Sequence, residues 1–93
     1  MNRLNVEQRL IDYIQLLKSI KHRCSVAEML KCDEHRLVAE GILVRWQGGC
    51  SADSMRAAIA VERRLLLASD FGGRVAEEIG AAFSQIRWAM GFR

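Results

Sequence analysis

Residues 25–37, with the sequence SVAEMLKCDEHRL, decide how the middle of this chain is interpreted. Ser25 is followed three residues later by Glu28, a capping box in which each side chain bonds the backbone N–H of the other residue at a helix start. Asp33 offers a second N-cap just behind this short segment. The stretch therefore predicts two short helices separated by a tight break.

The second of these helices should run from about Glu34 to Ala39 or Glu40, with Gly41 as its C-cap. Residues 42–46 are apolar and rich in β-branched side chains, and a glycine pair follows them at 48–49. This pattern fits a strand leading into a hairpin, or an extended connection packed on the core. A rudimentary β-wing is therefore expected at residues 42–50.

Three other segments show apolar residues every three or four positions, which is the signature of an amphipathic helix. The first should begin at Asn5, as its N-cap, and end near 18–21. Another should begin at Ser51 or Asp53 and end near Ser69, and the last should run over 74–90, after a glycine pair. The expected fold is mainly α, a compact five-helix domain with a helix-turn-helix at its centre.

Length and composition limit the architectures that this chain can adopt. The 93 residues are 51% hydrophobic and contain no proline, which suits a single all-helical domain over residues 1–93. Because so small a core is often reinforced by association, we expect a homodimer built on the last two helices. Lysine and arginine exceed aspartate and glutamate by 14 to 11, and this net charge of +3 permits a nucleic-acid partner without requiring one.

Localisation is inferred from what the sequence lacks. Residues 1–10 hold no apolar core of the length a secretory signal needs, and no apolar run reaches the length of a membrane span. The cysteines number three, an odd count that favours reduced thiols over a disulfide framework. We therefore expect a cytoplasmic protein with no membrane association.

The central stretch resembles the helix-turn-helix of small phage and bacterial transcription regulators. Ala27, Leu30, Cys32 and Leu37 match the small and apolar positions of that motif, whereas Lys31 stands where the family usually has glycine. The resemblance covers about residues 25–49 and implies a DNA-binding transcription regulator that contacts double-stranded DNA as a dimer. The implied contacts, with Arg36 as the best candidate for a guanine edge, are Lys21, Arg23, Lys31, Glu34, His35, Arg36 and Arg45.

Histidines and cysteines near the same stretch raise a metal-site alternative, formed by His22, Cys24, Cys32 and His35, with Cys50 further on. Zinc sites commonly carry a Cys-x2-Cys knuckle, which this spacing lacks, so buried cysteines are favoured over a metal site. The same residues could pair as nucleophile and base, yet no phosphate loop or carboxylate pair accompanies them. We therefore expect neither a cofactor nor an enzyme.

The alternative function is a small inhibitor or adaptor, of the kind carried by phages and plasmids, which binds a protein partner through its helical surface. Aromatic residues, methionine and arginine are enriched in protein interfaces, and the C-terminal region supplies them. The candidate interface residues are Leu66, Phe83, Trp88 and Phe92. A single positive stripe across the central helix would favour DNA, and mixed charge there would favour a protein.

Overall fold

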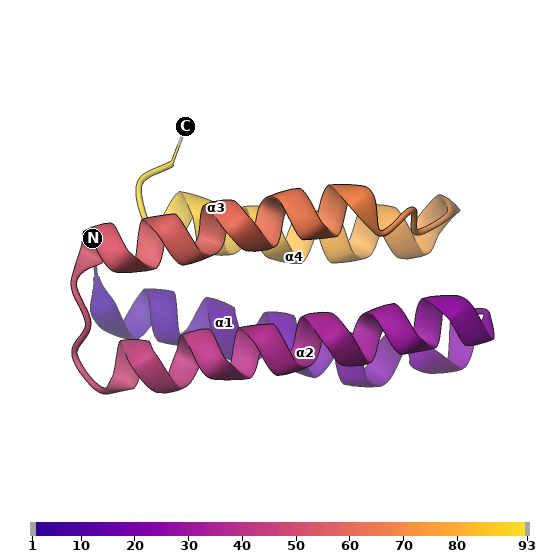
Figure 1. The fold of residues 1–93 in the computed structure, drawn as a ribbon, viewed down its shortest axis with the longest axis horizontal. Coiled ribbons are helices and arrows are strands. Elements are labelled where there is room, and N and C mark those ends of the chain that lie inside the picture. Colours follow the sequence, from indigo (N-terminus) through magenta and orange to yellow (C-terminus); the bar gives the residue numbers. More distant parts are fainter. Residues whose placement is uncertain (1, 93) are drawn as a thin grey trace.

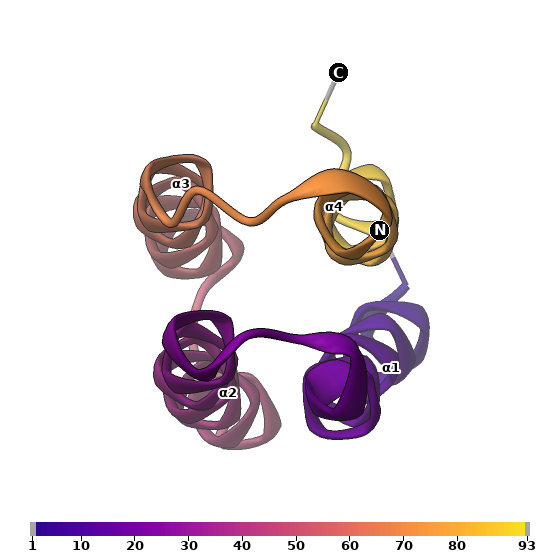
Figure 2. The same ribbon diagram turned by 90° about the vertical axis from the view of Figure 1, so that its right-hand side faces the viewer.

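The computed structural model describes residues 2–92 as four antiparallel α-helices. Successive helices run in opposite directions (Figure 1), and seen from the end they occupy the corners of a square, each beside the next in the chain (Figure 2). The helices are α1 (Arg3–Ser19), α2 (Val26–Gln47), α3 (Ala52–Ala68) and α4 (Gly73–Ala89), with a 3₁₀ turn, η1 (Ile20–Arg23), between the first two.

The mainly helical fold class is confirmed, and the first and the last two helices lie within a few residues of their predicted positions. Two details are wrong. Over residues 2–92 there are four α-helices rather than five, and none of these residues forms a strand, so the β-wing predicted at 42–50 is absent. Both errors come from the same segment, residues 33–47.

That segment belongs to one uninterrupted helix, α2, instead of two helices and a strand. Its buried residues recur at intervals of three and four from one end to the other: Cys32, His35, Ala39, Ile42 and Trp46. Asp33 is not an N-cap, because it lies inside α2, where its carboxylate accepts a hydrogen bond from Lys21 Nζ at 2.9 Å. A glycine inside a helix, such as Gly41, destabilises it by about 1 kcal/mol relative to alanine. Burial of the apolar residues beyond Gly41 stabilises the helix by about 1.5–3 kcal/mol per large side chain, which outweighs that cost.

The helix starts follow the sequence signals more closely. Both hydrogen bonds of the capping box predicted at Ser25 are present. Ser51, rather than Asp53, is the N-cap of α3, and its hydroxyl accepts from Ser54 N. The prediction for the first helix was wrong by three residues, because Asn2 caps α1 in place of Asn5.

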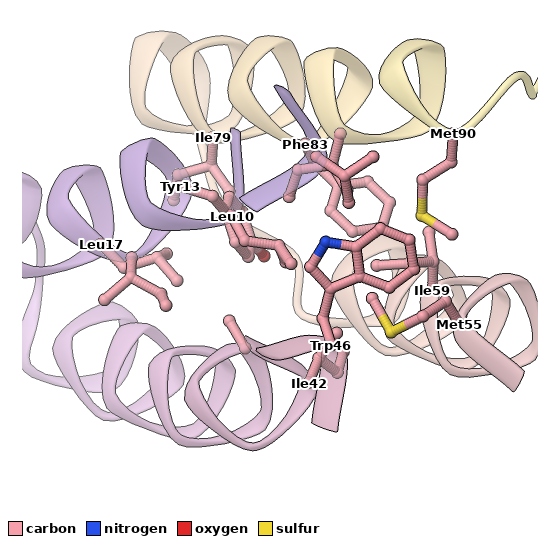
Figure 3. Close-up of a cluster of buried hydrophobic side chains, with 14 of the residues drawn as sticks. Leu10, Tyr13, Leu17, Ile42, Trp46, Met55, Ile59, Ile79, Phe83 and Met90 are labelled. Atoms are coloured by element: carbon pink, nitrogen blue, oxygen red, sulfur yellow. The ribbon is translucent and has the colours of Figure 1, made fainter. Parts of the chain in front are cut away.

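The core fills the space between the four helices (Figure 3). Leu10 and Leu17 of α1 are fully buried, and the ring of Tyr13 lies 5.5 Å from that of Phe83 on α4. At one end Trp46 and Arg3 form a reciprocal clasp. The indole N–H donates to the Arg3 carbonyl at 3.0 Å, while the Arg3 guanidinium donates to the Trp46 carbonyl and stacks 3.7 Å from the indole ring.

Helix α3 is packed less closely than the others. The backbone of α1 lies close to those of both α2 and α4 over much of its length, whereas α3 approaches α2 at fewer positions and α4 at fewer still. Among the residues of α3 only Met55, Ile59 and Glu62 are fully buried. This looser contact leaves the surface hollowed along the boundary between α2 and α3.

Candidate protein-binding groove

The basic residues predicted to contact DNA are largely engaged in ion pairs. Lys21 lies 2.9 Å from Asp33, Arg23 pairs with Glu78, and Lys31 lies 3.6 Å from Glu34. Arg36, the residue predicted to read a guanine, donates to Glu40 one turn along the same helix at 2.5 Å. Apart from Arg45, for which the described residues provide no ion pair, the predicted contact surface carries mixed charge rather than a positive stripe.

His35 does not occupy the exposed position that the resemblance implied, because its side chain is buried between α2 and α3. Its Nδ1 donates to the Glu62 carboxylate at 2.9 Å, and the Tyr13 hydroxyl donates to the same oxygen at 2.8 Å. His35 Nε2 lies 2.6 Å from the hydroxyl of Ser69, at the C-terminal end of α3. This polar chain joins α1, α2 and α3 through the middle of the bundle.

The direction of the hydrogen bonds follows from the groups available. The Leu65 carbonyl can only accept, so the single hydroxyl hydrogen of Ser69 is donated to it, at 2.7 Å. The oxygen of that hydroxyl can in turn accept from His35 Nε2, while the other ring nitrogen faces the Glu62 carboxyl group. Burial, reinforced by the charge of Glu62, raises the pKa of Tyr13 above its usual value, so the phenol stays a donor.

Serine, histidine and glutamate linked in this order have the connectivity of a hydrolase triad, but the chemistry differs. The Ser69 hydroxyl donates to the Leu65 carbonyl instead of to the histidine. Ser69 also lies at the carbonyl end of α3, where the helix dipole opposes the negative charge of an oxyanion. The arrangement fixes the position of α3 on α1 and α2 and does not activate a nucleophile.

Beside this polar chain the surface between α2 and α3 forms an apolar groove. Two hollows make it up, and they share Val38. Val61 and Leu65 of α3 face Val38 of α2 across the groove, and all three remain more than a third exposed. The groove is open because the rest of its α3 wall consists of small side chains, namely Ser54, Ala57, Ala58 and Ala68.

The edges of the groove are mainly basic. Arg45 lines one end on the α2 side, and Lys31 lines the other with its partner Glu34. On α3, Arg64 is exposed and lies three residues beyond Val61, on the outer edge of the same wall. Neither Arg45 nor Arg64 forms an ion pair with any residue between 2 and 92.

The residues predicted as a protein interface do not form one surface. Phe83 is buried in the core and is corrected from an interface residue to a core residue. Leu66 and Phe92 are half-buried against that core, with the Phe92 ring 5.2 Å from the Arg87 guanidinium. Only Trp88 is exposed, at 68% of its surface, and it lies on α4, diagonally across the bundle from α2 (Figure 2).

Cys24 and Cys32 are neighbours whose side chains interact, but within residues 2–92 the cysteine and histidine residues do not gather into one cluster. Cys24 donates to the Ile20 carbonyl, His22 lies 2.6 Å from the Ser19 carbonyl, and Cys32 is buried in the core. Across the part of the chain that the structure describes, no three His, Cys, Asp or Glu side chains are placed to hold a metal ion. Nor does this part of the chain contain a helix both long and apolar enough to cross a membrane.

Glu62 was missed by the sequence analysis, although a signal was present. It falls on the same helical stripe as Met55, Ile59 and Leu66, so an acidic side chain stands among positions that face the interior. Such a residue calls for a buried partner. Comparison with known protein families, with curated proteins and with solved structures found no match to this chain.

Proposed function

We propose that this protein is a non-enzymatic inhibitor or adaptor that binds a protein partner in the groove between α2 and α3. The observation that carries the proposal is the alignment of Val38, Val61 and Leu65, large apolar side chains that line one groove and stay partly exposed. An elongated apolar groove between two helices suits an amphipathic helix, which inserts the side chains of its apolar face.

The charge around the groove defines the partner further. Arg45 and Arg64, on opposite edges, have no ion pair within residues 2–92 and are available to carboxylates. A partner helix with acidic residues beside its apolar face would therefore be attracted and oriented. Burying the exposed part of each apolar side chain under the partner would make the free energy of binding more favourable by about 25 cal/mol per Å² of area removed from water.

DNA binding is the rival function, and the mixed charge of the α2 surface weighs against it. A DNA-binding surface neutralises several phosphates with free lysine and arginine side chains. Here Lys21, Arg23 and Arg36 each already face a carboxylate. The two functions predict different responses to salt. Several phosphate contacts make affinity fall steeply as salt rises, whereas binding in an apolar groove with two flanking arginines should fall much less.

The test uses a synthetic amphipathic helix with leucines along one face and glutamates on its flanks, monitored by fluorescence anisotropy. We expect binding that Leu65→Glu weakens by at least about tenfold, because a carboxylate would enter the apolar groove. Leu67→Glu is the matched control, since this leucine on the same helix is exposed outside the groove. A peptide with lysines in place of the glutamates should bind more weakly.

Three outcomes would contradict the groove. The peptide could bind equally well to the Leu65→Glu protein, or binding could depend on Trp88, which Trp88→Ala would reveal. In the third, a mixed-sequence DNA duplex would bind with a steep salt dependence, and Arg36→Ala would alter its sequence preference. That result would restore DNA as the partner, with the paired arginine released on binding.

A further inference from the structure

The outer face of α2, opposite to its buried face, carries a row of exposed apolar side chains. Leu30, Leu37 and Val44 are 61%, 63% and 66% exposed, and Val26 precedes them at 76%. The first three are spaced seven residues apart, which is close to two helical turns, so they form a straight stripe along the helix. We call these three residues the outer seam.

The residues around the outer seam follow a heptad register. With the seam residues at the d positions, Glu34 and Gly41 fall at the a positions between them. One flank, the g positions, carries Asp33 and Glu40, while the other flank, the e positions, carries Lys31, Val38 and Arg45. One side of the seam is therefore acidic, and the other is basic and apolar.

We propose that the outer seam binds a second copy of this chain, with the two α2 helices side by side and parallel. In a parallel pair each g residue lies beside the e residue five positions further along the other helix. Glu40 of one copy would then face Arg45 of the second copy. The intrahelical bond between Arg36 and Glu40 uses only Oε1, and no residue between 2 and 92 bonds the other carboxylate oxygen.

Charge decides against the antiparallel alternative. In an antiparallel pair, e residues face e residues and g residues face g residues. Lys31 would then lie near Arg45 of the second copy, and the two Glu40 side chains would approach each other. A face that is acidic on one flank and basic on the other is self-complementary only in the parallel arrangement, which a two-fold axis along the helices generates.

Two residues that lie between those of the outer seam, Gly41 and Glu34, set how closely the two copies approach. Gly41 has no side chain, and a Cβ there would meet nothing within 4 Å, so the second helix can come close at this level. Glu34 acts in the opposite direction, because the two Glu34 carboxylates would meet across the two-fold axis. Its pairing with Lys31 at 3.6 Å offsets part of that repulsion.

The first experiment measures the oligomeric state of the full chain by sedimentation velocity over a range of concentrations. We expect dimers for the unmodified protein and for Leu67→Asp, and monomers for Leu37→Asp. Both substitutions replace an exposed leucine, so both proteins should keep the same helical circular dichroism. A monomeric unmodified protein, or a Leu37→Asp protein that remains dimeric, would overturn the proposal.

The second experiment tests the orientation. Arg45→Glu and Glu40→Arg should each weaken the dimer by about tenfold, and the double exchange should recover much of the loss. In a chain with Cys24 and Cys50 replaced by serine, Val44→Cys should crosslink to itself across the dimer. In an antiparallel pair Val44 would lie opposite Glu34 of the second copy, so crosslinking only when the second copy carries Glu34→Cys would overturn the parallel assignment.

Val38 and Arg45 border both surfaces, so the dimer and the partner groove are tested separately with residues that belong to only one of them. Leu65→Glu on α3 should weaken peptide binding by at least about tenfold and leave the dimer intact. Leu37→Asp on α2 should do the reverse. Glu34→Gln should tighten the dimer, since it removes the like charges that meet in the seam, and a weaker dimer in this variant would contradict the seam.

Discussion

Helices α1 and α3 have the same length but contribute to the fold in opposite ways. α1 buries Val6, Leu10, Tyr13, Ile14 and Leu17 between its two neighbours, whereas α3 buries two apolar residues and the carboxylate of Glu62. The first is held by packing along its whole length. The second is held at its centre by a polar chain and leaves apolar side chains at its surface. In this bundle, the loosely packed helix is the one that leaves an apolar groove open along its boundary with α2.

The largest effect is expected where α3 is anchored. Glu62→Ala removes the carboxyl group that is hydrogen-bonded to Tyr13 and His35 and leaves two buried polar groups without a partner. Each buried group left unpaired costs about 1–3 kcal/mol, so the total loss is about 2–6 kcal/mol. Urea unfolding followed by circular dichroism measures the loss. A cost below about 1 kcal/mol would show that α3 is not anchored by this network.

Two leucine-to-alanine substitutions compare how tightly α1 and α3 are packed. Leu10→Ala in α1 should cost about 3 kcal/mol, because it opens a cavity in a fully enclosed site. Leu66→Ala in α3 should cost about 1 kcal/mol, since that side chain is half-buried and its surroundings can relax. Both values come from the same unfolding experiment. Equal costs would mean that α3 is as tightly packed as α1.

Alkaline pH should destabilise the α1–α2 side of the core. Burial raises the pKa of the Cys32 thiol to about 12 and also raises that of Tyr13. A pKa raised in the folded state contributes stability that is complete below the unfolded value, about 9 for cysteine, and is lost as pH rises towards the folded value. Urea midpoints should therefore fall between pH 9 and 12. The urea midpoint of the Cys32→Ala protein should fall less steeply over this pH range. An unchanged slope would show that the Cys32 thiol is not the group responsible.

The smallest of these effects concerns the start of α2. Ser25→Ala removes the hydroxyl that accepts from Glu28 N and should cost about 1 kcal/mol. Glu28 also accepts from Gly72 N, at the start of α4, so Glu28→Gln should loosen both helix starts. Hydrogen exchange at residues 26–29 and 73–76 should report this, with exchange at Leu10 as the internal reference.

The sequence predicted the starts of α2 and α3 and failed in the middle of α2. The signals at Ser25 and Ser51 are local, so a few neighbouring residues contain all that is needed. Residues 42–46 were interpreted as a strand or an extended connection, because Gly41 resembles a helix C-cap and β-branched side chains follow it. Their helical state depends on burial of Ile42 and Trp46 against other helices, which is a tertiary effect. The spacing from Cys32 to Trp46 carried that information.

The candidate site was harder to predict than the fold. Val61 and Leu65 were assigned to an apolar helix, but their partial exposure depends on how far α3 lies from α2. His35 was placed on the surface because its buried partner, Glu62, lies on a different helix, 27 residues away. Sequence spacing within one helix cannot pair residues across helices, so the polar chain appeared only once the bundle was assembled.

The clasp between Arg3 and Trp46 has a consequence for the order of folding. It closes the far end of the α1–α2 hairpin, while the Lys21–Asp33 pair lies beside the η1 turn at the other end. Contacts between neighbouring helices form early because little chain entropy is lost in closing a short loop. We expect this hairpin to be structured in the transition state, with φ-values high at Leu10 and low at Ile59. Helix α3 would then dock last and detach first, so the binding groove would open without loss of the hairpin.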